Sequence, residues 1–366
     1  MMPRPLEHLL TALTDPASVG ELRLGDWDAL LRVARVASLE ARLHALLQER
    51  DLFDRVPARP RRHLEAAGRV AAEQHHRMRW EVEQVHEALA ARKAPVVILK
   101  GAAYLMAGLP SARGRLFADL DIMVPRPALA TTEHVLFTRG WLAQGHDEYD
   151  QTYYRRWMHE LPPLTHIRRK SVLDVHHTVL PPTARLHPDP DKLFAAATPL
   201  PGWQNLYVLA PTDMVLHSAT HLFHDGELEN GLRDLVDLDD LVRHFHRHVD
   251  GFWPALVDRA HEMDLARPLF YGLRYAAHFL NTPVPATVNE GLAAAGPGVP
   301  LRPLMDGLFR RGLAPHHWQC DDWLSPTCRW ILYVRSHYLR MPLRLLVPHL
   351  TRKAIKRRLA PPEAHA

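Results

Sequence analysis

The stretch RLFADLDIMVPRP, residues 115–127, has the pattern of a short buried strand that carries two acids. Leu120 and Ile122 alternate with Asp119 and Asp121, so the aliphatic side chains share one face of the strand and the carboxylates share the other. Two like charges this close raise each other's pKa, and a fold tolerates them on a solvated surface or around a cation. The strand therefore predicts a sheet whose second face is either solvated or a metal site.

Around this strand the spacing of apolar residues changes twice, from helical to strand-like and back, which predicts an α+β fold. Residues 1–92 are rich in helix formers and predict an N-terminal helical region. Residues 93–180 contain short apolar runs bounded by proline and glycine, as expected for a small mixed-sheet core. We expect a helical domain that closes the cleft at 181–282, and a linker with a basic C-terminal tail at 283–366. Further strands of the core are expected in DQTYYRRW, HELPPLTHI and SVLDVHHTVL.

Composition indicates a globular protein. The chain has 366 residues, of which 47% are hydrophobic, and this is enough for a sizeable core. No apolar stretch resembles a signal peptide or approaches the ~18 residues of a membrane-spanning helix. Cys320 and Cys328 lack metal-ligand spacing and are expected to be reduced thiols. We therefore expect a cytoplasmic location.

A second buried strand is expected in APVVILKG, which runs into a helix through Lys100 and Gly101. A glycine at such a turn lets the backbone approach an anion at the helix N-terminus. A lysine there supplies a positive charge for phosphate oxygens. One lysine and one glycine form a short signal, which suggests a phosphate-binding turn without specifying the ligand.

Asp174, in SVLDVHHTVL, is a third acid on an expected strand, where it alternates with Leu173 and Val175. If this strand lies beside that of Asp119 and Asp121, three carboxylates converge. Three acids can hold two divalent ions, one of which activates an attacking oxygen while the other neutralises a triphosphate. The pattern therefore predicts Mg²⁺ or Mn²⁺ as the cofactor and an NTP as the substrate.

Several short motifs follow one another between residues 95 and 240. They are a Leu-Lys-Gly turn, an arginine, an Asp-x-Asp strand, a His-Glu-Leu-Pro stretch and an Asp-x-His strand, in LKGAAYLMAGLPSARGRLFADLDIMV, HELP and VLDVHHTVL. In this order they resemble the uncharacterised bacterial nucleotidyltransferases of the polymerase-β-like superfamily. The resemblance implies a polymerase-β-like core and a Mg²⁺-dependent transfer of a nucleoside monophosphate from an NTP to a hydroxyl acceptor on a small molecule or protein.

The resemblance also implies roles for individual residues. Asp119 and Asp121 match the paired metal ligands of the family, and Asp174 matches the third carboxylate. The triphosphate would be bound by Lys100, Gly101 and a loop arginine, either Arg113 or Arg115. Better-studied members of the superfamily have Gly-Ser in the phosphate turn, whereas alanine follows the glycine here, so the lysine would compensate for the missing hydroxyl.

Polar residues flank these acids on the neighbouring expected strands, namely His159, Glu160, His166 and His176. A histidine titrates near neutral pH, so it can act as a general base for an acceptor hydroxyl or contact the nucleotide base. Glu160 and His176 are the strongest candidates for a direct catalytic role.

A second hypothesis starts from His217, His221 and His224, whose i, i+4, i+7 spacing predicts one helical face. The set resembles the ligands of histidine-aspartate metal-dependent phosphohydrolases when it is extended to Asp225, Asp234 and Asp237. A helical face that packs against the sheet explains the same histidines without a metal. A third hypothesis is a non-catalytic binding module that keeps the nucleotidyltransferase fold.

The C-terminal tail is strongly basic. No acid lies between Asp322 and Glu363, whereas this stretch contains nine basic residues mixed with Leu, Ile and Val. Such a tail suits an acidic protein partner or an anionic membrane surface, and it equally suits a solubilising helix. We do not expect a nucleic-acid partner, because the tail has no aromatic stacking platform and no base-reading motif.

Overall fold

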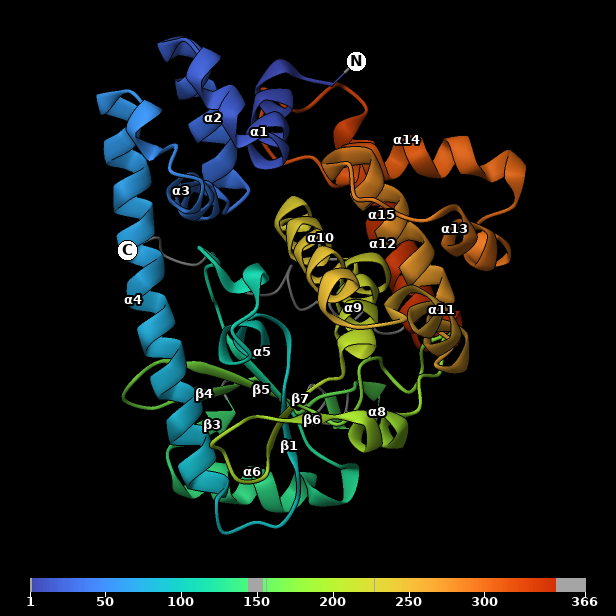
Figure 1. Cartoon of the computed structure of the whole chain (residues 1–366). Coiled ribbons are helices and arrows are strands. Elements are labelled where there is room, and N and C mark those ends of the chain that lie inside the picture. Colours follow the sequence, from blue (N-terminus) through green and yellow to red (C-terminus); the bar gives the residue numbers. More distant parts are fainter. Residues whose placement is uncertain (1, 144–153, 156, 227, 347–366) are drawn as a thin grey trace, which may run out of the picture.

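A seven-stranded mixed sheet organises the described part of the chain (Figure 1). The structure, a computed structural model, describes residues 2–143, 154–155, 157–226 and 228–346. The strand order is β3-β4-β5-β2-β1-β7-β6. The strands are β1 (Val96–Ile98), β2 (Leu120–Met123), β3 (Trp141–Ala143), β4 (Leu164–His166), β5 (Val172–His176), β6 (Thr198–Pro199) and β7 (Leu206–Val208).

Strands β1 and β2 form the apolar centre of this sheet. β2 pairs antiparallel with β1 and parallel with β5, and β1 pairs parallel with β7. Val97 and Ile98 are fully buried, and Ile122 is buried on the adjacent strand. The predicted strand at Asp121 is confirmed, but all four residues of β2 are buried, so the acid does not lie on a solvated face.

Other expected strands are confirmed in part. The segment HELPPLTHI contains β4 and SVLDVHHTVL contains β5. In DQTYYRRW, residues 150–153 and 156 lie outside the described residues, and the strand prediction is wrong for Tyr154 and Trp157, which are helical. The sheet also takes β6 and β7 from beyond residue 180, where the sequence predicts only helices, because strands of two or three residues are too short to show a period of two.

Helices flank the sheet at both ends of the chain, which confirms the predicted α+β fold with N-terminal and C-terminal helical regions. Before the sheet come α1 (Arg4–Thr14), α2 (Leu24–Val36), α3 (Glu40–Glu49) and α4 (Ala58–Leu89), and between its strands lie α5 (Lys100–Met106), α6 (Leu129–Thr138) and α8 (Pro190–Ala196). After the sheet come α9 (Pro211–Thr220), α10 (Gly231–His248), α11 (Phe252–Glu262), α12 (Ala266–Leu280), α13 (Ala286–Leu292), α14 (Arg302–Gly312) and α15 (Ser325–Arg340). None of the described helices is both long and apolar enough to cross a membrane.

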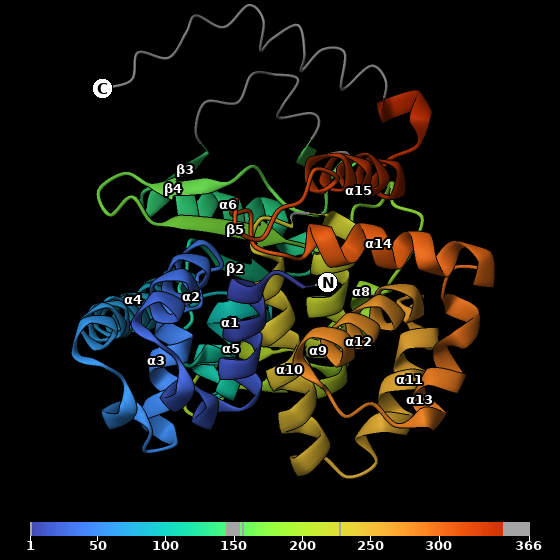
Figure 2. The ribbon, with the colours of Figure 1, turned by 90° about the horizontal axis from the view of Figure 1, so that it is seen from above.

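The helices are arranged in two groups around a central pair. Seen from above, α1 to α4 lie on one side and α11 to α15 on the other, with α9 and α10 between them (Figure 2). In the view of Figure 1, α6 lies below the sheet, whereas α5, α9 and α10 lie above it. Because α5 contacts both β2 and α9, the strand that carries Asp121 lies beneath α5 and α9.

A π-helical turn, His221–Asp225, continues α9 and ends at Gly226, whose φ is 75°. This turn is wound more widely than an α-helix, and His224 within it lies near Arg335 and Arg340, whereas His217 and His221 lie near Lys100 and Asp121. The prediction of one histidine face is therefore wrong for His224. This turn packs against α15, and His224 is only 2% exposed there. Neither ring nitrogen of His224 has a hydrogen-bond partner among the described residues. Burial, together with the charges of Arg335 and Arg340, lowers the pKa of His224 to about 3.

We expect the free energy of unfolding to fall as the pH drops below 6.5, and His224→Leu to weaken this fall. An unfolded histidine takes up a proton near pH 6.5, whereas folded His224 resists protonation down to a pH of about 3. The stabilising contribution of the neutral His224 ring is therefore fully present above pH 6.5. Below that pH the free energy of unfolding falls by about 1.4 kcal/mol per pH unit, or about 2 kcal/mol in total at pH 5. Urea denaturation of wild type and variant at several pH values between 8 and 5 measures the difference.

The exposed His187 provides the matched control, and His187→Leu should keep the pH dependence of the wild type. Equal pH dependence for wild type and His224→Leu would contradict the low pKa of the buried ring.

Candidate active site

The register between β2 and β5 brings two of the predicted acids side by side. Asp121 on β2 pairs with Asp174 on β5, and neighbouring strands lie about 4.8 Å apart. Paired residues of parallel strands point to the same face of the sheet. Asp119 immediately precedes β2, two residues before Asp121. The two acid-bearing strands are therefore neighbours, as convergence of the three carboxylates requires.

The carboxylate of Asp121 lies at the centre of a buried polar network. Its Oδ1 accepts hydrogen bonds from Lys100 Nζ at 2.8 Å and from His176 Nε2 at 3.0 Å. Because a carboxylate only accepts, His176 carries its proton on Nε2 in this arrangement. Burial opposes the charged form of Asp121, but Lys100 and His176 hold the pKa of the carboxyl well below its ordinary value.

For Asp174 and Asp119 the pKa is raised, the opposite of what happens to Asp121. Burial, and then the charge of Asp121, raise the pKa of Asp174 to about 7, and the same causes raise the pKa of Asp119. The Oδ1 atom of Asp174 is buried and has no hydrogen-bond partner among the described residues. The acids of this site therefore carry more negative charge than the neighbouring basic side chains neutralise.

His176 connects this network to Glu160. The two residues form an antiparallel β-bridge, and His176 Nδ1 lies 3.4 Å from Glu160 Oε2. His159 Nε2 lies 3.9 Å from the same carboxylate oxygen. In the part of the chain that the structure describes, His159, Glu160 and His176 are the group whose potential ligand atoms all lie within 4.8 Å of one another. The fourth predicted polar neighbour, His166, instead contacts Arg169 and the Trp141 ring.

Lys100 reaches Asp121 through an unusual backbone conformation. It is the first residue of α5 and has a φ of 48°, in the left-handed region. This conformation costs a residue other than glycine on the order of 1 kcal/mol. The preceding Leu99 N–H donates to the Asp121 carbonyl at 3.0 Å and holds the turn against β2. Burial opposes charge on Lys100, but the Asp121 carboxylate raises the pKa of the ammonium, so the lysine stays charged.

Gly101 leaves room for the side chain of Arg115. A Cβ atom at Gly101 would lie 2.6 Å from Arg115 Cζ and 3.0 Å from the Phe117 ring. Through this gap Arg115 Nε donates to Asp237 Oδ2 on α10 at 2.7 Å, and both side chains are buried. These two predicted triphosphate residues therefore lie in a contact between the sheet region and α10.

The two candidate loop arginines differ in position. Arg115 lies close enough to Asp119 to favour the charged form of that carboxyl. Arg113 is exposed and pairs with Glu49 at the end of α3. The structure thus brings Arg115, rather than Arg113, into the neighbourhood of the acids.

His217 and His221 face the same network from above the sheet. The charges of Lys100 and Asp121 act on both rings, and burial holds the pKa of His221 at about 3, so its imidazole is neutral at pH 7. Arg233 also favours the charged form of Asp119, whereas its i, i+4 spacing to Asp237 in the sequence suggested only a pair that stabilises the helix. The i, i+4 spacing of the histidines indicated a shared face, but no local signal showed that this face meets the Asp121 strand.

The described residues of the phosphohydrolase hypothesis do not form one group of metal ligands, although His221 and Asp234 lie near enough to act on each other's charge. Asp234 accepts from Arg233 at 2.7 Å and Asp237 accepts from Arg115, so both acids already have cationic partners. His224 lies toward α15, and the side chain of Asp225 is outside what the structure describes. The geometry therefore does not support this hypothesis.

The acids on β2 and β5 fit a divalent cation. Mg²⁺ and Mn²⁺ prefer carboxylate oxygens, and the buried, unpartnered Oδ1 of Asp174 lies beside the strand position of Asp121. The described ligand atoms of Asp119, Asp121 and Asp174 are not all within 4.8 Å of one another, so cation binding requires their side chains to draw together.

The chain matches a family model described as an uncharacterised nucleotidyltransferase over residues 24–281. The match covers well over half of the chain, from α2 through the whole sheet to α12. It extends on both sides of the range 95–240 in which the motifs resemble such enzymes. No protein with curated annotation and no solved structure matches the chain.

We expect Arg115→Met to lower the free energy of unfolding by about 3–5 kcal/mol, because it leaves Asp237 buried without its partner. The double variant Arg115→Met/Asp237→Leu should recover much of this loss, since both charges are then removed. Urea denaturation of wild type, the single variants and the double variant measures the coupling.

Arg113→Met removes an exposed pair with Glu49 and serves as the control, with an expected loss of about 1 kcal/mol or less. If Arg115→Met is as mild as Arg113→Met, the buried pair does not join α10 to the sheet region.

Proposed function

Since the chain belongs to the uncharacterised nucleotidyltransferase family, we propose that it transfers a nucleoside monophosphate from an NTP to a hydroxyl group of a small molecule or a protein. The observation that carries this proposal is the register pair Asp121–Asp174 beside a partly buried lysine, Lys100. Acids on adjacent strands, with a cation next to them, are what metal-assisted transfer of a phosphoryl group requires.

In this proposal Asp119, Asp121 and Asp174 hold Mg²⁺ or Mn²⁺. When bound, the ions polarise the α-phosphate, favour the deprotonated acceptor and neutralise the pyrophosphate that leaves. The unpartnered Oδ1 of Asp174 supports this assignment, because a buried carboxylate oxygen without a partner is costly unless a ligand satisfies it. Burial, and then the negative charge of Asp121, raise the pKa values of Asp119 and Asp174, and a bound cation would offset both effects.

Lys100 binds the triphosphate in this proposal. Its ammonium lies 2.8 Å from Asp121, and its side chain is 22% exposed, so a phosphate oxygen has access to it. A lysine acts as a point charge, and it can exchange a carboxylate partner for a phosphate partner. We assign Gly101 and Arg115 to the same region, and we leave out Arg113 because it pairs with Glu49.

Glu160 accepts the proton of the acceptor hydroxyl, and His176 positions Glu160. The Glu160 side chain is 18% exposed whereas that of His176 is 3% exposed, so the acceptor meets the carboxylate. His176 is held by Asp121 at Nε2 and faces Glu160 with Nδ1. As the acceptor oxygen bonds to the α-phosphorus, its proton passes to Glu160 and the bond to pyrophosphate breaks.

A decisive experiment incubates the protein with each α-labelled NTP, Mg²⁺ or Mn²⁺, and an extract of cytoplasm, the location that we propose for it. Mass analysis should find the nucleoside monophosphate on a small molecule or protein. Labelled nucleic-acid ends would contradict the proposed acceptor. Label that ends on free NDP or NMP, with none on an acceptor, would favour a hydrolase, and NTP binding without any product would favour a non-catalytic module.

We expect Asp174→Asn to abolish Mg²⁺-dependent transfer while leaving the thermal midpoint unchanged or slightly higher. Asparagine has the same shape, and it removes a charge that burial and Asp121 already oppose. The loss should be at least about 10³-fold in kcat, as expected for a residue that acts on the transition state. Thermal denaturation and the labelled-NTP assay measure the two effects on the same preparation.

Asp191→Asn, at an exposed position of α8, is the matched control and should keep full activity. Activity of Asp174→Asn within about tenfold of the wild type would remove Asp174 from the proposed site.

A further inference from the structure

Helix α15 turns an apolar face toward solvent. Its buried side consists of small and apolar residues that pack on the protein, namely Ser325, Cys328, Leu332 and Ser336. Its outer side carries large side chains with exposed fractions of 64% for Trp330, 38% for Ile331, 46% for Tyr333, 44% for Val334 and 43% for Tyr338. Single exposed apolar residues are ordinary, but a contiguous set along one helix marks an interaction surface.

Two of the three arginines of α15, Arg329 and Arg335, make contacts within the protein. Arg335 donates to the Phe223 carbonyl at 3.0 Å, and its guanidinium lies over the Tyr271 and Phe309 rings. Arg329 donates to Asp321 at 2.9 Å. The described helix thus uses these two charges for internal contacts and leaves aromatic rings outside, the reverse of the usual surface helix.

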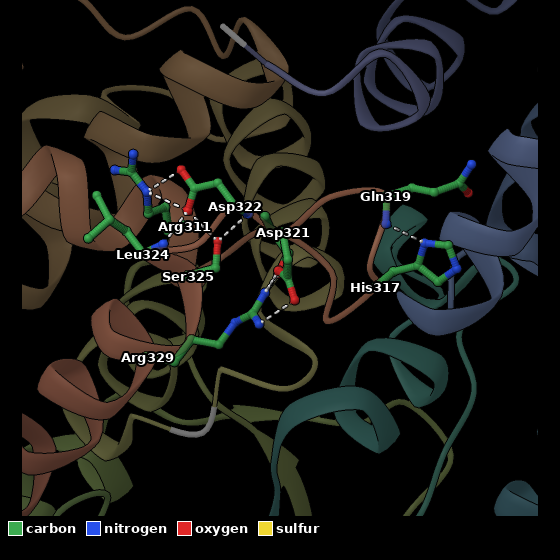
Figure 3. Close-up of polar contacts among 9 residues, drawn as sticks. Arg311, His317, Gln319, Asp321, Asp322, Leu324, Ser325 and Arg329 are labelled. Atoms are coloured by element: carbon green, nitrogen blue, oxygen red, sulfur yellow. Dashed lines mark hydrogen bonds and ion pairs between the residues drawn. The ribbon is translucent and has the colours of Figure 1, made fainter.

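The start of this helix is firmly held. Figure 3 shows that Asp322 accepts from Arg311 at 2.9 Å and from the Ser325 hydroxyl at 2.9 Å, next to the Asp321–Arg329 pair. Two further tryptophans, Trp318 and Trp323, lie on the connection from α14 with exposed fractions of 77% and 85%. We call the exposed residues of α15 the aromatic face (Trp330, Ile331, Tyr333, Val334 and Tyr338); the Tyr338 ring also contacts the Arg185 guanidinium at 3.9 Å.

The chain continues from α15 into a basic segment. Residues 347–366, which lie outside the described structure, contain five basic residues, Arg352, Lys353, Lys356, Arg357 and Arg358, and one acid, Glu363. Tryptophan and tyrosine favour the boundary between lipid headgroups and hydrocarbon, and a polybasic segment is attracted to anionic lipid. Stable peripheral binding requires two such signals, and here they follow one another in the sequence.

We propose that the aromatic face of α15 docks the protein on a lipid membrane, and that the positive charge of the sequence after α15 makes an anionic membrane the preferred one. A second copy is disfavoured as the occupant, because it would bring two basic tails together. The basic tail is disfavoured as the occupant of the aromatic face, because it would be repelled by the arginines of α15 and of the segment after it, namely Arg329, Arg335, Arg340 and Arg344. An acidic protein would account for the tail but would not require the aromatic rings. The expectation that no aromatic rings accompany the tail is wrong in the structure, so binding of the full chain to a single-stranded oligonucleotide in place of anionic vesicles would overturn the proposal.

Co-sedimentation of the full chain with phosphatidylcholine vesicles, with and without phosphatidylglycerol, tests this docking. We expect binding to the anionic vesicles that weakens as the salt concentration rises. Trp330→Ala/Val334→Ala should reduce vesicle partitioning at least about tenfold by removing apolar contact area. Replacing Lys353, Lys356, Arg357 and Arg358 by Gln should reduce it similarly and flatten the salt dependence.

Phe137→Ala is the matched control, because Phe137 is 61% exposed on α6, away from α15, and it should not change vesicle binding. Absence of wild-type binding to anionic vesicles would overturn the proposal, as would binding that the double variant leaves unchanged. A dimer of the wild type that is lost in Trp330→Ala/Val334→Ala, measured by light scattering without lipid, would identify the aromatic face as a self-association surface instead. Vesicle binding that appears only after the tail charges are removed would show that the tail covers the face.

Discussion

The hydrogen-bonded ion pair between Lys100 and Asp121 is the interaction on which the candidate active site depends. A charge on a strand with both faces buried is tolerated only when a partner compensates it, and β2 has such a charge. Lys100 adopts a left-handed φ to supply the partner, and His176 supplies a second donor. Burial and the ionised Asp121 together make the neighbouring Asp174 hard to ionise, with a pKa of about 7. One buried pair therefore determines the charge state of the acids around it.

A second set of ion pairs holds α10 over this site. Arg115 reaches Asp237 past Gly101, and Arg42 on α3 donates to Asp240 at 2.7 Å. From the sequence, Asp234 and Asp237 could be metal ligands. In the structure Asp237 and Asp240 instead accept from arginines in distant parts of the chain, and Asp234 accepts from its neighbour Arg233. These pairs connect the N-terminal helices and the phosphate-turn region to α10, so the site is formed by three parts of the sequence rather than by the sheet alone.

The main features of the fold were predictable because they leave local patterns. Alternating aliphatic residues identified β2 and β5, and the acids on these strands were recognised as a possible constellation before their register was known. β6 and β7 were missed because they are too short for a pattern, and His224 was misplaced because a π turn leaves no signature in residue spacing. The roles of Asp119, Asp121, Asp174, Lys100 and Glu160 remain predictions.

The sequence by itself determined that the chain alternates between helical and strand periods, that its acids fall on strands, and that its last part is basic. These properties depend on neighbours within a few residues, since side-chain direction follows from the period of the local structure. Only the tertiary structure decided which face is buried, that Lys100 pairs with Asp121, that Arg115 pairs with Asp237, and that α15 exposes its aromatic rings. Each of these depends on segments far apart in sequence, and burial and ion pairing are properties of what packs against a residue, which no local pattern contains.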